Sequence, residues 1–181
     1  NMEQIEQIQK IVDDLLFLAQ LDIKIKNKAF ERFTLDELFI EIFETNRFFR
    51  IKNNIDIEFK RFQTVAVQGN RNLLLRMLSN LITHVLQITP PGCKVAITIE
   101  KDKNNALFII VTTGTGDTTK LHADYFDHVK SNGFFYENEA ENFGLGFSIV
   151  NKIIDIHQGN FDVTVNQGNG TKFCISIPAC E

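Results

Sequence analysis

Two glycine-containing segments in the C-terminal half are the part of the sequence best suited to hold a ligand through the main chain. They are residues 112–116 (TTGTG) and residues 144–146 (GLG). Glycine has no Cβ atom, so the backbone at these points can turn tightly or approach a ligand closely. A helix is predicted to begin at Leu145, and the N-terminus of such a helix could face an anion. Equally, the glycines could serve only to preserve the fold.

Composition excludes several other classes of protein. The 181 residues carry a formal net charge of −4, so the basic surface that phosphate backbones require is missing, and we expect no nucleic-acid partner. No apolar run approaches the roughly 20 residues that cross a bilayer, so we expect no direct membrane contact. The three cysteines, Cys93, Cys174 and Cys180, lack C-x-x-C spacing, which favours reduced thiols in the cytoplasm.

The N-terminal segment is predicted to be a helix with one apolar seam. Its apolar residues recur at alternating steps of three and four, the heptad spacing of helices that pack together: Ile5, Ile8, Val12, Leu15 and Ala19. We interpret residues 1–22 as the end of a helix from a dimerisation bundle. The alternative is an amphipathic helix that folds back on its own domain.

Residues 23–181 are predicted to form one α/β domain. A strand at residues 29–33 leads into a helix that Thr34 and Glu37 could cap and that runs to about Lys52. The further predicted strands are residues 55–59, 94–100, 106–111, 160–166 and 172–177, and the further helices follow Asn70 and cover residues 121–129 and 145–157. This alternation predicts a two-layer sandwich, in which a mixed, mostly antiparallel sheet is covered on one face by about three helices.

Four motifs in order give the sequence a resemblance to a known family. They are residues 80–90 (NLITHVLQITP), residues 112–116, residues 125–129 (YFDHV) and residues 144–150 (GLGFSIV), the last followed by HQG and GNGT. They resemble the asparagine, glycine and phenylalanine boxes of the ATP-binding domain of two-component sensor histidine kinases, in the group that also contains Hsp90, gyrase and mismatch-repair ATPases. The resemblance implies a Bergerat-type fold, ATP and magnesium as cofactors, a homodimer through the N-terminal helix, and a response regulator as partner.

The resemblance also implies an ATP site. Its residues would be Asn80, His84, Gln87, Thr112, Gly114, Gly116, Gly144, Leu145, Gly146 and Thr171. His84 stands where the family has an asparagine that binds magnesium, although magnesium prefers oxygen ligands; a histidine that fills the cleft is the simpler interpretation. Gln87 replaces a lysine that would offset phosphate charge, and Thr112 replaces the acid that selects adenine.

Two further features depart from an active kinase. The loop at residues 131–143 would close over the nucleotide, yet it carries Glu137, Glu139 and Glu141 and no lysine or arginine. Its aromatic residues would either plug the empty cleft or dock another protein. No histidine is followed by the acid that usually follows the family's phosphoacceptor, so that acceptor would lie outside this chain.

Three functions therefore remain open. The first is a pseudokinase that acts as a relay or docking module. The second is an active kinase domain that transfers the γ-phosphoryl group of ATP to a histidine outside the chain. The third is a chaperone or mismatch-repair type ATPase, which the short lid and the leading helix disfavour.

Overall fold

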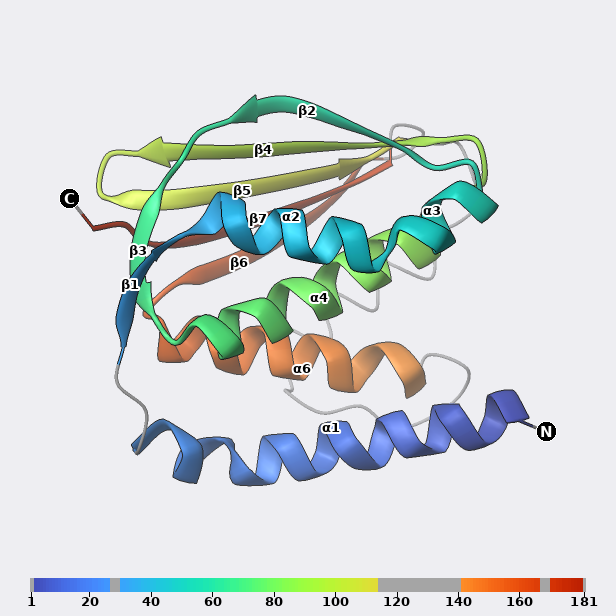
Figure 1. Ribbon diagram of the computed structural model, residues 1–181, viewed down its shortest axis with the longest axis horizontal. Helices are drawn as coiled ribbons and strands as arrows, with labels where there is room; N and C mark the ends of the chain where they lie inside the picture. The colour runs from blue at the N-terminus through green and yellow to red at the C-terminus, as the bar shows by residue number, and fades with distance from the viewer. Residues whose placement is uncertain (1, 27–29, 114–140, 167–169, 181) are drawn as a thin grey trace.

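A five-stranded mixed sheet forms one layer of the protein. The computed structural model describes residues 2–26, 30–113, 141–166 and 170–180 (Figure 1). In order across the sheet, the strands are β2 (Asp56–Phe62), β4 (Lys94–Asp102), β5 (Asn105–Thr112), β7 (Gly170–Pro178) and β6 (Asn160–Asn166). Only β2 and β4 run parallel. The predicted hairpin of β4 and β5 is confirmed, with Asp102 opposite Asn105 at its end.

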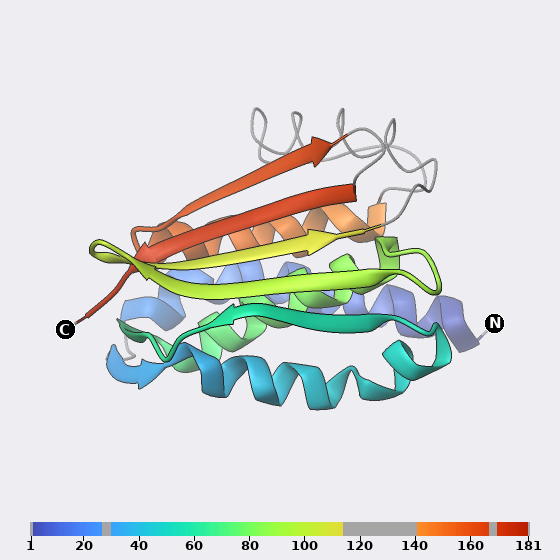
Figure 2. The same ribbon diagram turned by 90° about the horizontal axis from the view of Figure 1, so that it is seen from above.

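Three helices cover one face of this sheet, as predicted (Figure 2). They are α2 (Leu35–Thr45), α4 (Arg71–Ile88) and α6 (Glu141–Ile156). Alternate residues of the strands point toward these helices, so that Ile97, Phe108 and Phe173 are almost completely buried. Asn70 caps α4 as predicted, because its side chain accepts a hydrogen bond from the Leu73 amide at 3.2 Å.

Two details of the predicted elements are wrong. Thr34 precedes α2, but its hydroxyl makes no capping bond; instead the Leu35 amide donates to the carbonyl of Val65 at 3.1 Å. The helix expected to reach Lys52 is interrupted at Asn46, whose side chain donates back to the Ile42 carbonyl at 2.9 Å. The short helix α3 (Arg47–Lys52) follows this interruption. Asparagine favours helix ends because its amide competes for backbone groups in this way.

A second, two-stranded sheet joins the start of the domain to its middle. The strand β1 (Glu31–Thr34) pairs antiparallel with β3 (Ala66–Gly69). The sequence did not predict β3, because four residues are too few to show an alternating pattern.

The N-terminal helix α1 (Met2–Lys26) forms an outer layer beneath α6 and α4 (Figure 1). A different face from the predicted seam contacts the domain: Asp14 is buried and pairs with Arg76 of α4 at 2.7 Å. The seam residues remain on the surface, with Ile8 61% exposed and Val12 47% exposed. None of the described helices is both long and apolar enough to cross a membrane.

Candidate functional site

The predicted site residues of α4 lie along one face of that helix. Asn80, His84 and Gln87 are spaced by four and three residues, which places them one above the other. They line a pocket together with Gly146 and Phe147 of α6, and Lys10 of α1 reaches the same pocket. Its volume is about 20 Å³, which is room for about one water molecule.

His84 lies among aromatic rings. The imidazole is buried, and it meets the ring of Phe147 edge-on at a centroid distance of 4.5 Å. The ring of Phe173 in β7 lies at 6.2 Å, also edge-on. Edge-to-face contacts of this kind stabilise a packed core. Neither phenylalanine was predicted to be part of the site; the available signal was the aromatic Phe147 directly after Gly146.

Asn80 has a buried amide nitrogen that makes no hydrogen bond to any described residue. A buried donor without a partner is costly, so such a group often faces a water or a ligand. The surroundings of the Asn80 side chain therefore suit a polar ligand.

Thr112 and Thr171 are brought together at the ends of β5 and β7. The Thr112 hydroxyl accepts a hydrogen bond from the Thr171 amide at 3.0 Å and lies 3.4 Å from the Thr171 carbonyl oxygen. Both threonines are buried. Because a hydroxyl has one proton to donate, the Thr112 hydroxyl donates its proton toward the Thr171 carbonyl of the neighbouring strand β7.

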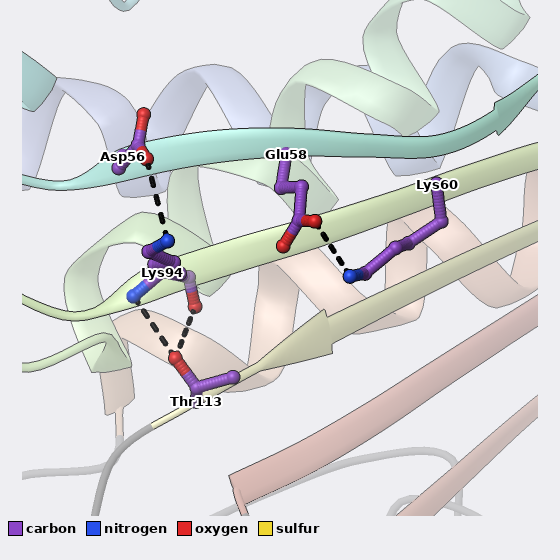
Figure 3. A network of polar contacts seen from close by, with 5 residues as sticks. All are labelled: Asp56, Glu58, Lys60, Lys94 and Thr113. Atoms are coloured by element: carbon purple, nitrogen blue, oxygen red, sulfur yellow. Dashed lines mark hydrogen bonds and ion pairs between the residues drawn. The ribbon is translucent and has the colours of Figure 1, made fainter.

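Thr113, near the start of the predicted glycine loop, is held in place by hydrogen bonds to Lys94. Thr113 donates its amide to the Lys94 carbonyl at 2.8 Å, and its hydroxyl bonds both the amide and the carbonyl of Lys94 (Figure 3). The end of β5 is thereby fastened to the start of β4. Gly114 and Gly116 follow directly but lie outside the described residues, as do residues 125–129 and the predicted lid up to residue 140.

The helix predicted to begin at Leu145 begins four residues earlier, at Glu141. Gly144, Leu145 and Gly146 therefore lie within α6, and Leu145 does not form the anion-facing end that the sequence suggested.

His157 connects three distant segments and was not predicted to do so. Its Nε2 accepts a hydrogen bond from the Asn70 amide at 3.1 Å, and Nδ1 lies 2.7 Å from the Ile153 carbonyl oxygen. These partners require a neutral ring that carries its proton on Nδ1. The ring also stacks on Phe30 at 5.1 Å, between α1 and β1.

We expect His157 to make the stability of the domain depend on pH. Burial lowers the pKa of His157 below 6.5, and the hydrogen bond to Ile153 only partly opposes this shift. The unfolded chain therefore binds a proton more readily than the folded chain, and the free energy of unfolding should fall as pH drops from about 6.5 through the folded pKa. Urea denaturation between about pH 7.5 and about pH 5.5 measures this slope. The slope should shrink in His157→Gln; an unchanged slope would contradict the assignment.

Comparison with known proteins agrees with the arrangement of these elements. Residues 69–181 match the family described as histidine kinase-, DNA gyrase B- and HSP90-like ATPases. The chain is 26% identical over 178 residues to the heme sensor protein HssS of Staphylococcus haemolyticus, covering 97% of this chain and 38% of HssS. It is 28% identical over 182 residues to the sensor histidine kinase CusS of Escherichia coli K12, covering 99% of this chain and 37% of CusS. The chain thus spans less than two fifths of the length of these relatives.

Solved structures share the same fold. The catalytic domain of the histidine kinase ThkA superposes with a TM-score of 0.68 at 26% identity, covering 83% of this chain and 98% of that domain. Full-length ShkA in complex with AMPPNP gives a TM-score of 0.73 at 18% identity, covering 98% of this chain and 37% of ShkA.

Proposed function

The chain belongs to the histidine kinase-, DNA gyrase B- and HSP90-like ATPase family, as an ATPase domain of the sensor-kinase type, and from this premise we propose that it works as a pseudokinase. In this proposal the domain has weakened or lost binding of Mg-ATP. It acts as a cytoplasmic relay or docking module in a two-component system.

The surroundings of His84 carry this proposal. The family places a magnesium ligand at this position, but the His84 ring packs edge-on against Phe147 at 4.5 Å. Magnesium prefers a near-octahedral set of oxygen ligands, which a buried imidazole among aromatic rings does not supply. The residues at this position therefore do not fit the metal.

Two further positions support the same conclusion. The Thr112 hydroxyl bonds to the Thr171 backbone, so its proton is directed to β7, and Thr112 lacks the carboxylate that would accept a hydrogen bond from the adenine amino group. Gln87 is exposed and uncharged where a lysine would offset phosphate charge. The pocket that His84 and Gln87 line, at about 20 Å³, is far smaller than the roughly 300 Å³ or more of a typical ligand site.

The alternative is an active kinase domain, and Asn80 is the observation that favours it. Its buried amide nitrogen makes no hydrogen bond to a described residue and would suit a phosphate or a metal-bound water. The phosphoacceptor histidine of such an active kinase would lie outside this chain.

Nucleotide binding separates the two functions. A ligand at about 100 times its dissociation constant adds about 2.7 kcal/mol of stability, which would raise the melting temperature of a chain this size by about 5–10 °C. We expect no magnesium-dependent rise with ATP or ADP at millimolar concentration. A saturable rise that is lost in Asn80→Ala would overturn the pseudokinase proposal and establish a working site.

We also propose that residues 1–22 are a dimerisation helix and residues 23–181 the ATPase-type domain. The support is a stripe of apolar side chains on α1 that face away from the domain, with Ile5 63% exposed and Leu15 49% exposed. Two copies could bury this stripe in a helical bundle. A response regulator is the proposed partner of such a dimer, as ThkA was solved in complex with the response regulator protein TrrA.

The dimer proposal predicts a specific loss of association. Val12→Lys places a charge in the stripe without touching Asp14 or the docked face, so the variant should be monomeric while the parent chain dimerises with rising concentration. Light scattering measures the mass of both proteins. A parent chain that remains monomeric, or a variant that still dimerises, would contradict the proposal.

A further inference from the structure

The short helix α3 is held firmly in place although it buries none of its residues. A six-residue helix is unstable by itself. The side chains of Asn46 and Asn53 donate to the carbonyls of Ile42 and Phe49, each at 2.9 Å. The amide of Ile55 donates to the Arg50 carbonyl at 2.9 Å. Hydrogen bonds from the backbone and from two asparagine side chains therefore hold this helix in place. None of the residues of α3 is buried.

Large apolar side chains of α3 are exposed to solvent. Phe48 is 80% exposed, Ile51 is 68% exposed and Phe49 is 39% exposed. Single exposed apolar residues are common, but Phe48 and Ile51 are three positions apart and are therefore neighbours on one face of this helix. Such patches mark interaction sites more often than chance.

The cations of α3 have no carboxylate partner in the part of the chain that the structure describes. Arg47, Arg50 and Lys52 take part in none of the ion pairs among the described residues. By contrast, each of three other arginines bonds a carboxylate at 2.7 to 2.9 Å: Arg61, Arg71 and Arg76. The Nε atom of Arg50 is also buried without a hydrogen-bond partner in the part of the chain that is described. A guanidinium in this state is suited to an incoming carboxylate.

A hollow beside α3 gives such a carboxylate a place to bind. It has a volume of about 600 Å³, and its lining is Arg47, Arg50, Ile51, Asn54, Ile55 and Asp56. Asp56 is the one acidic group in this lining, and its carboxylate lies 4.0 Å from Lys94 on the neighbouring strand (Figure 3). The balance of charge around the hollow therefore stays positive.

We propose that the α3 patch, defined as Arg47, Phe48, Arg50 and Ile51, is a docking surface for an acidic and apolar segment of another protein. A carboxylate of that segment enters the hollow between Arg47 and Arg50, and its apolar side chains cover Phe48 and Ile51. The helix α3, which carries the patch, lies at the β2 edge of the sheet (Figure 2), and α4 and α6 separate it from α1 (Figure 1).

Fluorescence anisotropy with a designed peptide tests this proposal on the full chain. The probe is a labelled amphipathic peptide built of glutamate and leucine, and its matched control has glutamine in place of glutamate. The acidic peptide should bind the parent chain, and the glutamine peptide should bind at least about tenfold more weakly. Arg47→Glu and Arg50→Gln should each weaken binding at least about tenfold, and Phe48→Ser about fivefold.

Two matched variants control for net charge and for apolar surface. Lys101→Glu reverses an exposed charge at the far end of β4, and Ile40→Ser removes an exposed apolar side chain of α2. Both should bind like the parent chain. Equal binding by Arg47→Glu and the parent chain, or no binding of the acidic peptide, would overturn the proposal. Phosphatidylglycerol vesicles that bind in an Arg47-dependent manner while the peptide does not would also overturn it, in favour of a membrane.

Discussion

Replacing Gly170 with alanine is expected to destabilise the domain by about 3 kcal/mol or more. The backbone at Gly170 has φ +89°, and a Cβ atom there would lie 1.7 Å from the carbonyl oxygen of Thr112. A positive φ costs a residue with a side chain about 1–3 kcal/mol, and moving packed backbone costs a similar amount. The melting temperature should fall by about 6–12 °C, as measured by thermal unfolding.

Gly146 provides the matched control for this substitution. A Cβ atom at Gly146 would meet nothing within 4 Å, and the residue lies inside α6. Gly146→Ala should therefore stabilise the domain by about 0.5–1 kcal/mol, because alanine loses less backbone entropy in a helix. Equal effects at the two glycines would contradict the geometry around Thr112. A stabilised Gly146→Ala variant would also fit a glycine that no longer serves a bound nucleotide.

Local patterns predicted the elements of the fold well. The alternation at residues 94–100 and 106–111 predicted β4 and β5, and the stop at Pro90 predicted the end of α4. Each of these patterns lies within a few consecutive residues, so it can be recognised from the sequence without knowledge of the tertiary structure. The parallel pairing of β2 with β4 was not predicted, because it depends on residues far apart in the sequence.

The chemistry of the site depends on contacts of that long-range kind. Thr112 and Thr171 are 59 residues apart and share two close contacts, while Asn70 and His157 are 87 residues apart. The motif positions told us which residues differ from an active kinase, but not what they contact instead. Only the structure shows that His84 packs edge-on against Phe147 and Phe173. The predicted glycines Gly114 and Gly116 stay predictions, since they lie outside the described residues.

Removing the charge of Arg76 is expected to loosen α1 from the domain. Arg76 bonds the buried carboxylate of Asp14 at 2.7 Å, and its guanidinium lies 3.9 Å from the centroid of the Phe17 ring. Arg76→Met keeps an apolar contact with Phe17 but leaves the Asp14 carboxylate without its partner. Because the Arg76 side chain is 35% exposed, we expect a loss of about 1–3 kcal/mol rather than the larger cost of a fully buried pair.

Hydrogen exchange along α1 measures this loss directly, since opening of the helix sets the exchange rate of its amides. Amides around Phe17 should exchange about tenfold faster or more in Arg76→Met. Arg71→Met is the matched control on the same helix: it removes the Arg71–Glu41 pair, whose side chains are 34% and 47% exposed, and should leave α1 unchanged. Equal protection of α1 in both variants would mean that apolar packing alone holds the helix. Faster exchange in Arg76→Met alone would instead show that the partly buried Arg76–Asp14 ion pair holds the proposed dimerisation helix on the domain.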